Sequence, residues 1–226
     1  ADWIKVMATG GVLTRGTSPA APQFGQDELD AAVAEARALG RHTAAHCHGT
    51  EGILRAARAG VRTIEHCSFA GDDGFGGALD LEVVGEIARS GAWVSPTVNS
   101  GFARFFAEDG APGKFATRMG EVYAQLRRAG VPFVASTDAG IPGIAHHRLA
   151  EALPIFARLA ELRPVEALRA ATSGAALALG LERVTGRLAP GLAADVLVVG
   201  GDPLEDLGAL ARPILVVARG RIVFRA

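Results

Sequence analysis

Four side chains that can take part in metal binding stand singly at the ends of separate apolar segments of the chain. They are Lys5, His46, His66 and Asp138. Imidazole and carboxylate groups bind divalent ions, and an uncharged lysine amine can react with carbon dioxide to form an anionic carbamate ligand. In αβ barrels the catalytic groups come from the carboxyl ends of several strands, which is where these residues are expected. The pattern predicts a metal-dependent hydrolase.

The two histidines occupy equivalent places in successive segments. His46 follows Gly40 by the same interval by which His66 follows Gly60, so two neighbouring units present an imidazole at the same height. A histidine at a strand end can also simply hydrogen-bond a loop. Two histidines in register, with Asp138 at the end of a later strand, favour a shared site over that alternative.

Three of the polar residues leave alternatives open. Lys5 interrupts an apolar strand, where an ammonium is costly unless it is paired or deprotonated; alternatively, its stem follows the apolar surface and its amine reaches solvent. His48 shares the face of His46 if the strand continues, and it can be a ligand, a loop-stabilising group or a substrate contact. We favour the substrate contact. We also assign His146, before a predicted helix, to substrate binding, with a solvent-exposed helix start as the alternative.

The elements that position these residues alternate regularly. Four predicted helices each end at a glycine, which supplies the left-handed backbone that terminates a helix, and each is followed by a short apolar strand. The helices are expected over residues 27–39, 51–59, 81–90 and 114–129, and the strands over residues 42–46, 62–66, 92–95 and 132–136. Together with the strand around Lys5, this alternation predicts an α/β fold with a parallel sheet of five strands and helices outside it.

The rest of the chain changes character from helix to strand. Helices are expected over residues 149–162, from Pro164, and from Ser173 to near Gly180. Four β-prone runs follow at residues 183–188, 194–199, 214–218 and 221–224, separated by turn residues. They predict a small β appendage, which is too short to bury both faces of a sheet alone.

The composition limits the classes of partner. The 226 residues are 49% hydrophobic and 21% charged, which suffices for a large core. A net charge of -1 without any Lys/Arg cluster argues against nucleic acid, and no apolar run is long enough to cross a membrane. We therefore expect a cytoplasmic protein that acts on a small molecule. Cys47 and Cys67 each follow a histidine and should point away from it as buried free thiols.

Several segments together resemble the amidohydrolase superfamily, in particular its imidazolonepropionase-like and prolidase-like enzymes. The segments are Ile-Lys-Val-Met-Ala-Thr-Gly-Gly at 4–11, Ala-His-Cys-His-Gly at 45–49, Ile-Glu-His at 64–66, Ser-Thr-Asp-Ala-Gly at 136–140, residues 167–181 and residues 186–195. Each motif alone is modest, but their order and spacing across almost the whole chain make the resemblance specific.

The resemblance implies a partial (β/α)8 TIM-type barrel, formed by strands 4 to 8 of the eight. Residues 1–182 would be the C-terminal part of this barrel, and residues 183–226 would be strands of a composite β-sandwich. It also implies two divalent ions, which we expect to be zinc, with manganese and cobalt as alternatives. A carbon dioxide-derived carbamate on Lys5 would bridge the two ions, His46 and His66 would bind one of them, and Asp138 would bind the other.

The implied reaction is hydrolysis of a C–N amide or peptide bond in a small substrate, such as an acylated amino acid or a dipeptide. A metal-activated hydroxide would attack the carbonyl, and Asp138 would carry the proton to the leaving amine. Hydrolysis of a cyclic imidazolone-type amide, a lactone or an organophosphate ester is the alternative chemistry.

The chain departs from the family pattern because it opens almost directly on the lysine strand. A further N-terminal segment is expected to supply a His-x-His motif and the remaining sandwich strands. The alternative of another class is a catalytically incomplete half-barrel that binds metal or a complementary chain. Unpaired sheet edges near Lys5 and in the C-terminal strands also allow association of identical chains into a homo-oligomer.

Overall fold

The computed structural model describes residues 1–226, which form two compact units. The first unit contains Ala1–Pro96 and Phe105–Pro132, and the second contains Thr97–Arg104 and Phe133–Ala226. The predicted boundary between residues 182 and 183 falls inside the second unit. None of the helices is long and apolar enough to cross a membrane.

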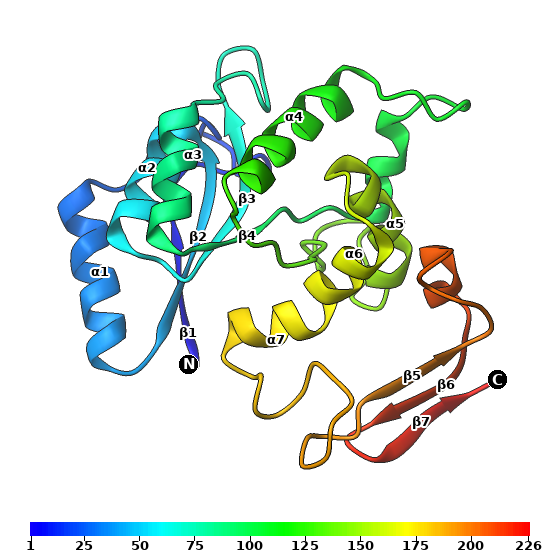
Figure 1. Ribbon diagram of the computed structural model, residues 1–226. Coiled ribbons are helices and arrows are strands. Elements are labelled where there is room, and N and C mark those ends of the chain that lie inside the picture. The colour runs from blue at the N-terminus through cyan, green and yellow to red at the C-terminus, as the bar shows by residue number, and fades with distance from the viewer. The chain divides into compact units, whose positions relative to one another are not determined.

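The first unit is built on a parallel sheet of four strands, ordered β1-β2-β3-β4 (Figure 1). The strands are β1 (Trp3–Met7), β2 (His42–Gly49), β3 (Thr63–Ala70) and β4 (Trp93–Ser95). The helices of this unit are α1 (Gln26–Ala38), α2 (Thr50–Ala59), α3 (Leu81–Ser90) and α4 (Lys114–Arg128). The predicted α/β fold with a parallel sheet is therefore confirmed.

The helices of the first unit bury apolar faces against the sheet. In α2, Ile53 and Ala56 are fully buried, as is Ile64 in the adjacent strand β3. Both cysteines are free and buried, as expected. The glycines that follow the four predicted helices have positive φ angles, namely Gly40, Gly60, Gly91 and Gly130. Only glycine takes this conformation at no steric cost, so these positions explain why each helix stops where the sequence predicts.

The fifth predicted strand, at residues 132–136, is wrong, because this segment adds no strand to the sheet. The carbonyl of Pro132 accepts a hydrogen bond from the amide of Val94 at 2.9 Å, but proline has no amide hydrogen with which to continue a ladder. The amide of Ala135 instead donates to the carbonyl of Ala170 at 3.0 Å. Phe133 and Ala135 of this segment are buried, but burial of apolar side chains alone does not make a strand.

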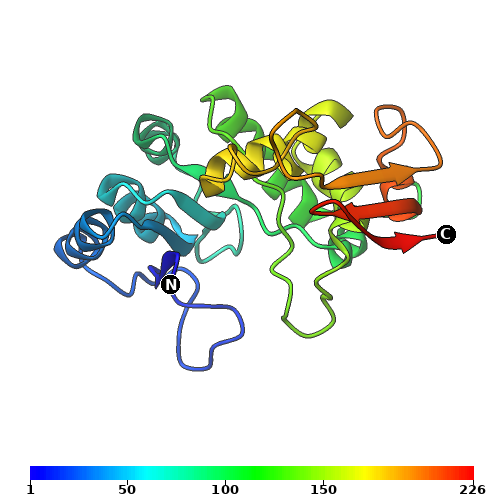
Figure 2. The same ribbon diagram turned by 90° about the horizontal axis from the view of Figure 1, so that it is seen from below.

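The second unit combines helices with an antiparallel sheet. Its helices are α5 (Leu149–Leu159), α6 (Pro164–Ala171) and α7 (Ser173–Leu179), and the short 3-10 helices of the chain are η1 (Ser100–Phe105) and η2 (Leu207–Ala211). The strands are β5 (Val196–Val199), β6 (Pro213–Ala218) and β7 (Arg221–Arg225). They lie side by side in the order β5-β6-β7, drawn from orange to red in Figure 2.

Three of the four predicted C-terminal strands are thus confirmed, and the run at residues 183–188 is not a strand. It forms turns in which the amides of Val184 and Thr185 both donate to the carbonyl of Leu181, and Gly186 has a φ of 99°. Leu197, Ile222 and Phe224 are exposed on the sheet at 48%, 57% and 44%. Such apolar exposure agrees with the expectation that this sheet cannot cover both of its faces by itself.

Candidate metal centre

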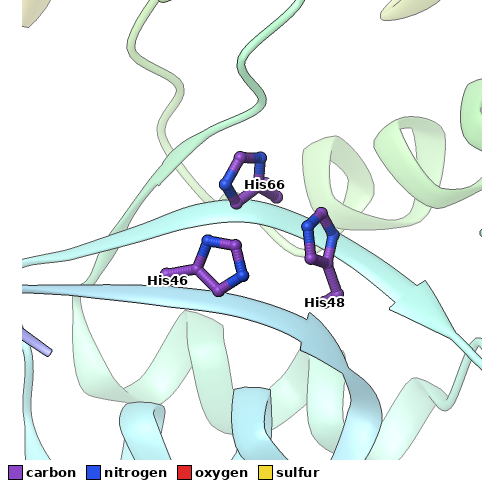
Figure 3. A group of neighbouring side chains, drawn as sticks. All are labelled: His46, His48 and His66. Carbon is purple, nitrogen blue, oxygen red and sulfur yellow. The ribbon is translucent and has the colours of Figure 1, made fainter. Parts of the chain in front are cut away.

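Strands β2 and β3 bring three histidines together in the first unit (Figure 3). The ring centroids of His46 and His66 are 4.5 Å apart, those of His46 and His48 are 4.7 Å apart, and those of His48 and His66 are 4.3 Å apart. His46 and His48 share a face of β2 because side chains alternate along a strand. His66 lies on the neighbouring strand β3, and it pairs in register with Cys47 of β2.

The backbone of β3 departs from regular strand geometry where it supplies His66. The φ angle is 67° at His66, 48° at Cys67 and 46° at Phe69, and the register with β2 shifts between Cys47 and Gly49. Left-handed conformations of non-glycine residues cost about 1–3 kcal/mol each and are concentrated at functional sites. In a regular strand the side-chain direction repeats at every second residue. The distortion of β3 breaks this alternation and turns His66 toward the two histidines of β2.

Hydrogen bonds fix the orientation of two of the rings. The Nε2 atom of His46 lies 3.2 Å from the carbonyl oxygen of Gly10, which can only accept, so Nε2 carries the hydrogen. The Nδ1 atom of His48 lies 2.8 Å from the hydroxyl oxygen of Ser68. The backbone amide of His48 also donates to the hydroxyl oxygen of Thr9 at 3.0 Å. The loop after β1 is therefore tied to both histidines of β2.

Burial keeps the imidazoles neutral. Desolvation, followed by the neighbouring His46, lowers the pKa of His48 to about 3. Desolvation, followed by His48, His46 and Lys5, lowers the pKa of His66 to about 2. These groups are therefore uncharged at neutral pH, the form in which imidazole binds a metal.

The histidine group fits a divalent ion. The ligand nitrogens of His46, His48 and His66 all lie within 4.8 Å of one another. Nitrogen ligands of one tetrahedral zinc ion are about 3.4 Å apart, given Zn–N bonds of about 2.1 Å. The three rings would therefore have to move closer together to bind one ion, and borderline metals such as zinc suit an imidazole site.

The other predicted site residues lie outside this histidine group. Lys5 is exposed on β1, an edge strand that pairs only with β2. Its charge helps to lower the pKa of His66, although desolvation and the two neighbouring histidines have larger effects. Asp138 and His146 belong to the second unit. Asp138 has a φ of 55°, and a Cβ atom added at Gly140 would lie 3.6 Å from the ring of His146. The loop that carries Asp138 therefore packs beside His146.

His48 is predicted to contact the substrate, and in the structure its ligand nitrogen also lies within 4.8 Å of those of His46 and His66. The His-x-His spacing was the signal for this, because it places both rings on one face of β2. The supporting groups Ser68 and Gly10 carried no comparable signal. A serine hydroxyl and a glycine carbonyl become recognisable as partners only when the fold brings them to the rings.

We predict that Gly10→Ala weakens metal binding. A Cβ atom at this position would lie 2.3 Å from the backbone oxygen of Ser18, so the loop must move and shift the carbonyl that holds His46. Loss of such an outer partner typically lowers metal affinity by about 10- to 100-fold. Competition with a chromophoric chelator measures the change in the intact protein. Gly85→Ala, in helix α3 with only the tip of Arg89 at 3.9 Å, is the control, and equal affinity in both variants would contradict the prediction.

Comparison with known proteins shows similarity along nearly the whole chain. The profile of the amidohydrolase family matches residues 1–223. Ochratoxinase of Aspergillus niger is 31% identical over 220 residues, covering 93% of this chain and 43% of its own length. Imidazolonepropionase of Ralstonia nicotianae is 45% identical over 101 residues, covering 42% of this chain and 24% of its own.

A solved structure agrees with these sequence matches. The crystal structure of a prolidase complexed with N-methylphosphonate-L-proline superposes with a TM-score of 0.79 and 32% identity. The match covers 100% of this chain and 55% of the prolidase chain. The chain therefore spans about half the length of the relatives that it matches.

Proposed function

The chain belongs to the amidohydrolase family, and we propose that it is part of a metal-dependent hydrolase that cleaves a C–N amide or peptide bond in a small substrate. The observation that carries this proposal is the group of three buried or half-buried histidines on two adjacent parallel strands, of which His48 and His66 are kept neutral by their lowered pKa values. The similarity to proteins named ochratoxinase and prolidase supports an acylated amino acid or a dipeptide as the substrate.

A second candidate reaction is the opening of a cyclic amide. It is favoured by the similarity to imidazolonepropionase, which at 45% is higher in identity than that to ochratoxinase, although it extends over only 101 residues. Both reactions cleave a C–N bond, so the same residues serve either substrate.

We assign separate roles to the predicted residues. We expect the two divalent ions to be zinc. When bound, they would lower the pKa of water and polarise the substrate carbonyl. His46 and His66 would hold one ion, and Lys5, as a carbamate, would contribute an anionic oxygen ligand. Lys5 is exposed on an edge strand, so its ammonium group would first have to lose a proton before it could react with carbon dioxide. Asp138 would be a ligand of the second ion, accept the proton of the attacking water and return it to the leaving amine.

His48 would contact the substrate. Its Nδ1 atom is already within hydrogen-bonding distance of Ser68, and its ring stacks on that of His66 with an interplanar angle of 25°. These contacts hold the ring in place, and there it would meet the substrate. His146 would contact another part of the substrate.

We propose that the remaining parts of the site come from protein outside these 226 residues. Residues 1–182 would form the C-terminal part of a (β/α)8 barrel, and residues 183–226 would complete a β-sandwich with strands from elsewhere. The match to only about half of ochratoxinase and of the prolidase supports this proposal, as does the exposed apolar face of the β5-β6-β7 sheet.

Metal analysis combined with turnover tests the proposal in the intact protein. We expect about two divalent ions per chain and hydrolysis of N-acyl amino acids or dipeptides, since both need the complete ligand set. Exhaustive chelation should abolish turnover, and zinc should restore it. Full turnover after the metal has been removed would contradict the proposed chemistry.

A further inference from the structure

A row of phenylalanine rings begins beside the histidine group. The ring of Phe75 lies 5.2 Å from that of His48, at an interplanar angle of 50°. Phe75 in turn contacts Phe115 edge to face at 6.1 Å, and Phe115 stacks on Phe105 at 4.0 Å with an angle of 26°. All of these residues belong to the first unit, so an apolar surface continues from the histidines within one compact body.

These phenylalanines differ from the core aromatic residues in exposure. Phe69, on strand β3, is fully buried, whereas Phe75, Phe105 and Phe115 are only half-buried. A half-buried cluster of aromatic rings leaves apolar area that can still be removed from water. Its continuity with His48 would place that area next to a substrate held at the histidines.

The loop that carries Phe75 is firmly attached to its surroundings. The amide of Gly76 donates to the carbonyl of Ser68 at 2.7 Å, and the amide of Ala78 donates to the carbonyl of Phe69 at 3.0 Å. The hydroxyl of Thr50, at the start of α2, donates to the carbonyl of Ala78 at 2.6 Å. Two of these bonds tie the loop to β3, the strand that supplies His66, so Phe75 and the histidine group are positioned by the same strand.

Helix α4 holds the other side of the same loop. The guanidinium of Arg118 donates to the carbonyl of Asp73, and Gly76, with a φ of 70°, packs so closely that a Cβ atom would lie 2.9 Å from the Cβ atom of Arg118. Phe115 precedes Arg118 by one helical turn of α4. The contact between Phe75 and Phe115 is therefore formed before any ligand arrives, and a preorganised apolar surface binds without an ordering cost.

We propose that Phe75, supported by Phe115 and Phe105, is a specificity-determining residue that binds an apolar substituent of the substrate beside the scissile bond. The inference rests on the proposed function and deepens it. The preferred substrates are amides whose acyl group or side chain is aromatic or a large aliphatic group, and small or charged groups at the same position are disfavoured. The rings of His48 and Phe75, 5.2 Å apart, supply apolar contact area for an uncharged substituent.

Two parallel readouts test this inference in the intact, zinc-loaded protein. The first is the ratio of kcat/KM for an N-acyl amino acid with a phenylacetyl group to that with an acetyl group. The second is the ratio of the dissociation constants of acetohydroxamate and phenylacetohydroxamate, which requires binding but no turnover. We expect both ratios to favour the aromatic compound by at least about tenfold, as burial of a phenyl ring predicts.

Phe75→Ala should bring both ratios to within about twofold of unity, because it removes the ring that meets the substituent. Phe75→Leu should retain most of the preference, since it keeps an apolar side chain at the same place, and it covers the case in which the alanine variant folds poorly. Phe24→Ala, an exposed phenylalanine of the first unit that precedes α1, is the matched control and should leave both ratios unchanged.

The outcomes separate the inference from the function on which it rests. Hydrolysis without an aromatic preference, or a preference that survives Phe75→Ala, would overturn the role of Phe75 and leave the hydrolase assignment standing. A Phe75-dependent hydroxamate preference without hydrolysis of any amide would overturn the hydrolase assignment and support the apolar subsite. Failure of the loaded protein to bind either hydroxamate would refute both.

Discussion

Asp138→Asn should lower kcat of the intact protein about 100- to 10,000-fold, which is the usual contribution of a positioned acid–base group. The amide of asparagine cannot accept a proton from the attacking water, although its size is nearly that of the carboxylate. Asparagine also tolerates the left-handed backbone of this position, where φ is 55°, so the fold should not suffer. Steady-state kinetics with an N-acyl amino acid, together with circular dichroism, measure the two effects separately.

Asp202→Asn is the matched control, since it is the same chemical change in the same unit. Its side-chain oxygen accepts from the amide of Leu204 at 2.8 Å, and the oxygen of asparagine can still do so. This control should keep full activity. If the Asp138 variant also turned over at the normal rate, its assignment as the proton carrier would be wrong, even if the protein bound metal as expected.

His66→Asn should reduce metal affinity by more than about 100-fold, because loss of an outer-shell partner alone already costs up to that factor. The variant removes the imidazole but retains a side chain that accepts a φ of 67°. A ligand that binds only the native state raises the melting temperature. The increase in melting temperature caused by excess zinc should therefore be smaller in this variant. Chelator competition and thermal unfolding with and without zinc measure both consequences.

His42→Asn is the corresponding control for a histidine outside the group. His42 is exposed at the start of β2, and its ring lies 5.1 Å from that of Trp3. We expect unchanged zinc affinity in this variant. An equal loss in both variants would mean that the effect of His66→Asn is general destabilisation, and an unchanged affinity in His66→Asn would remove this residue from the metal site.

The alternation of helices and strands in the first unit was predictable because its signals are local. Helix α1 begins and ends within one residue of the predicted range 27–39, and α3 matches the range 81–90. In each case the helical spacing of apolar residues defines the helix and a glycine defines its end. The strand predicted at residues 132–136 is absent from the sheet. Whether an apolar segment pairs with a strand depends on neighbouring segments that its own residues do not specify.

The side chains available for chemistry can be identified without the fold, since the motifs around Lys5, His46, His66 and Asp138 are local and carry the family resemblance. The fold is needed to show that His66 turns toward His46 and His48, and that Phe75 lies against His48. The physical reason lies in the backbone of β3, where left-handed residues break the twofold alternation from which strand patterns are inferred. A contact made by such a distortion, and by a loop anchored to α2 and α4, has no periodic signature in the sequence.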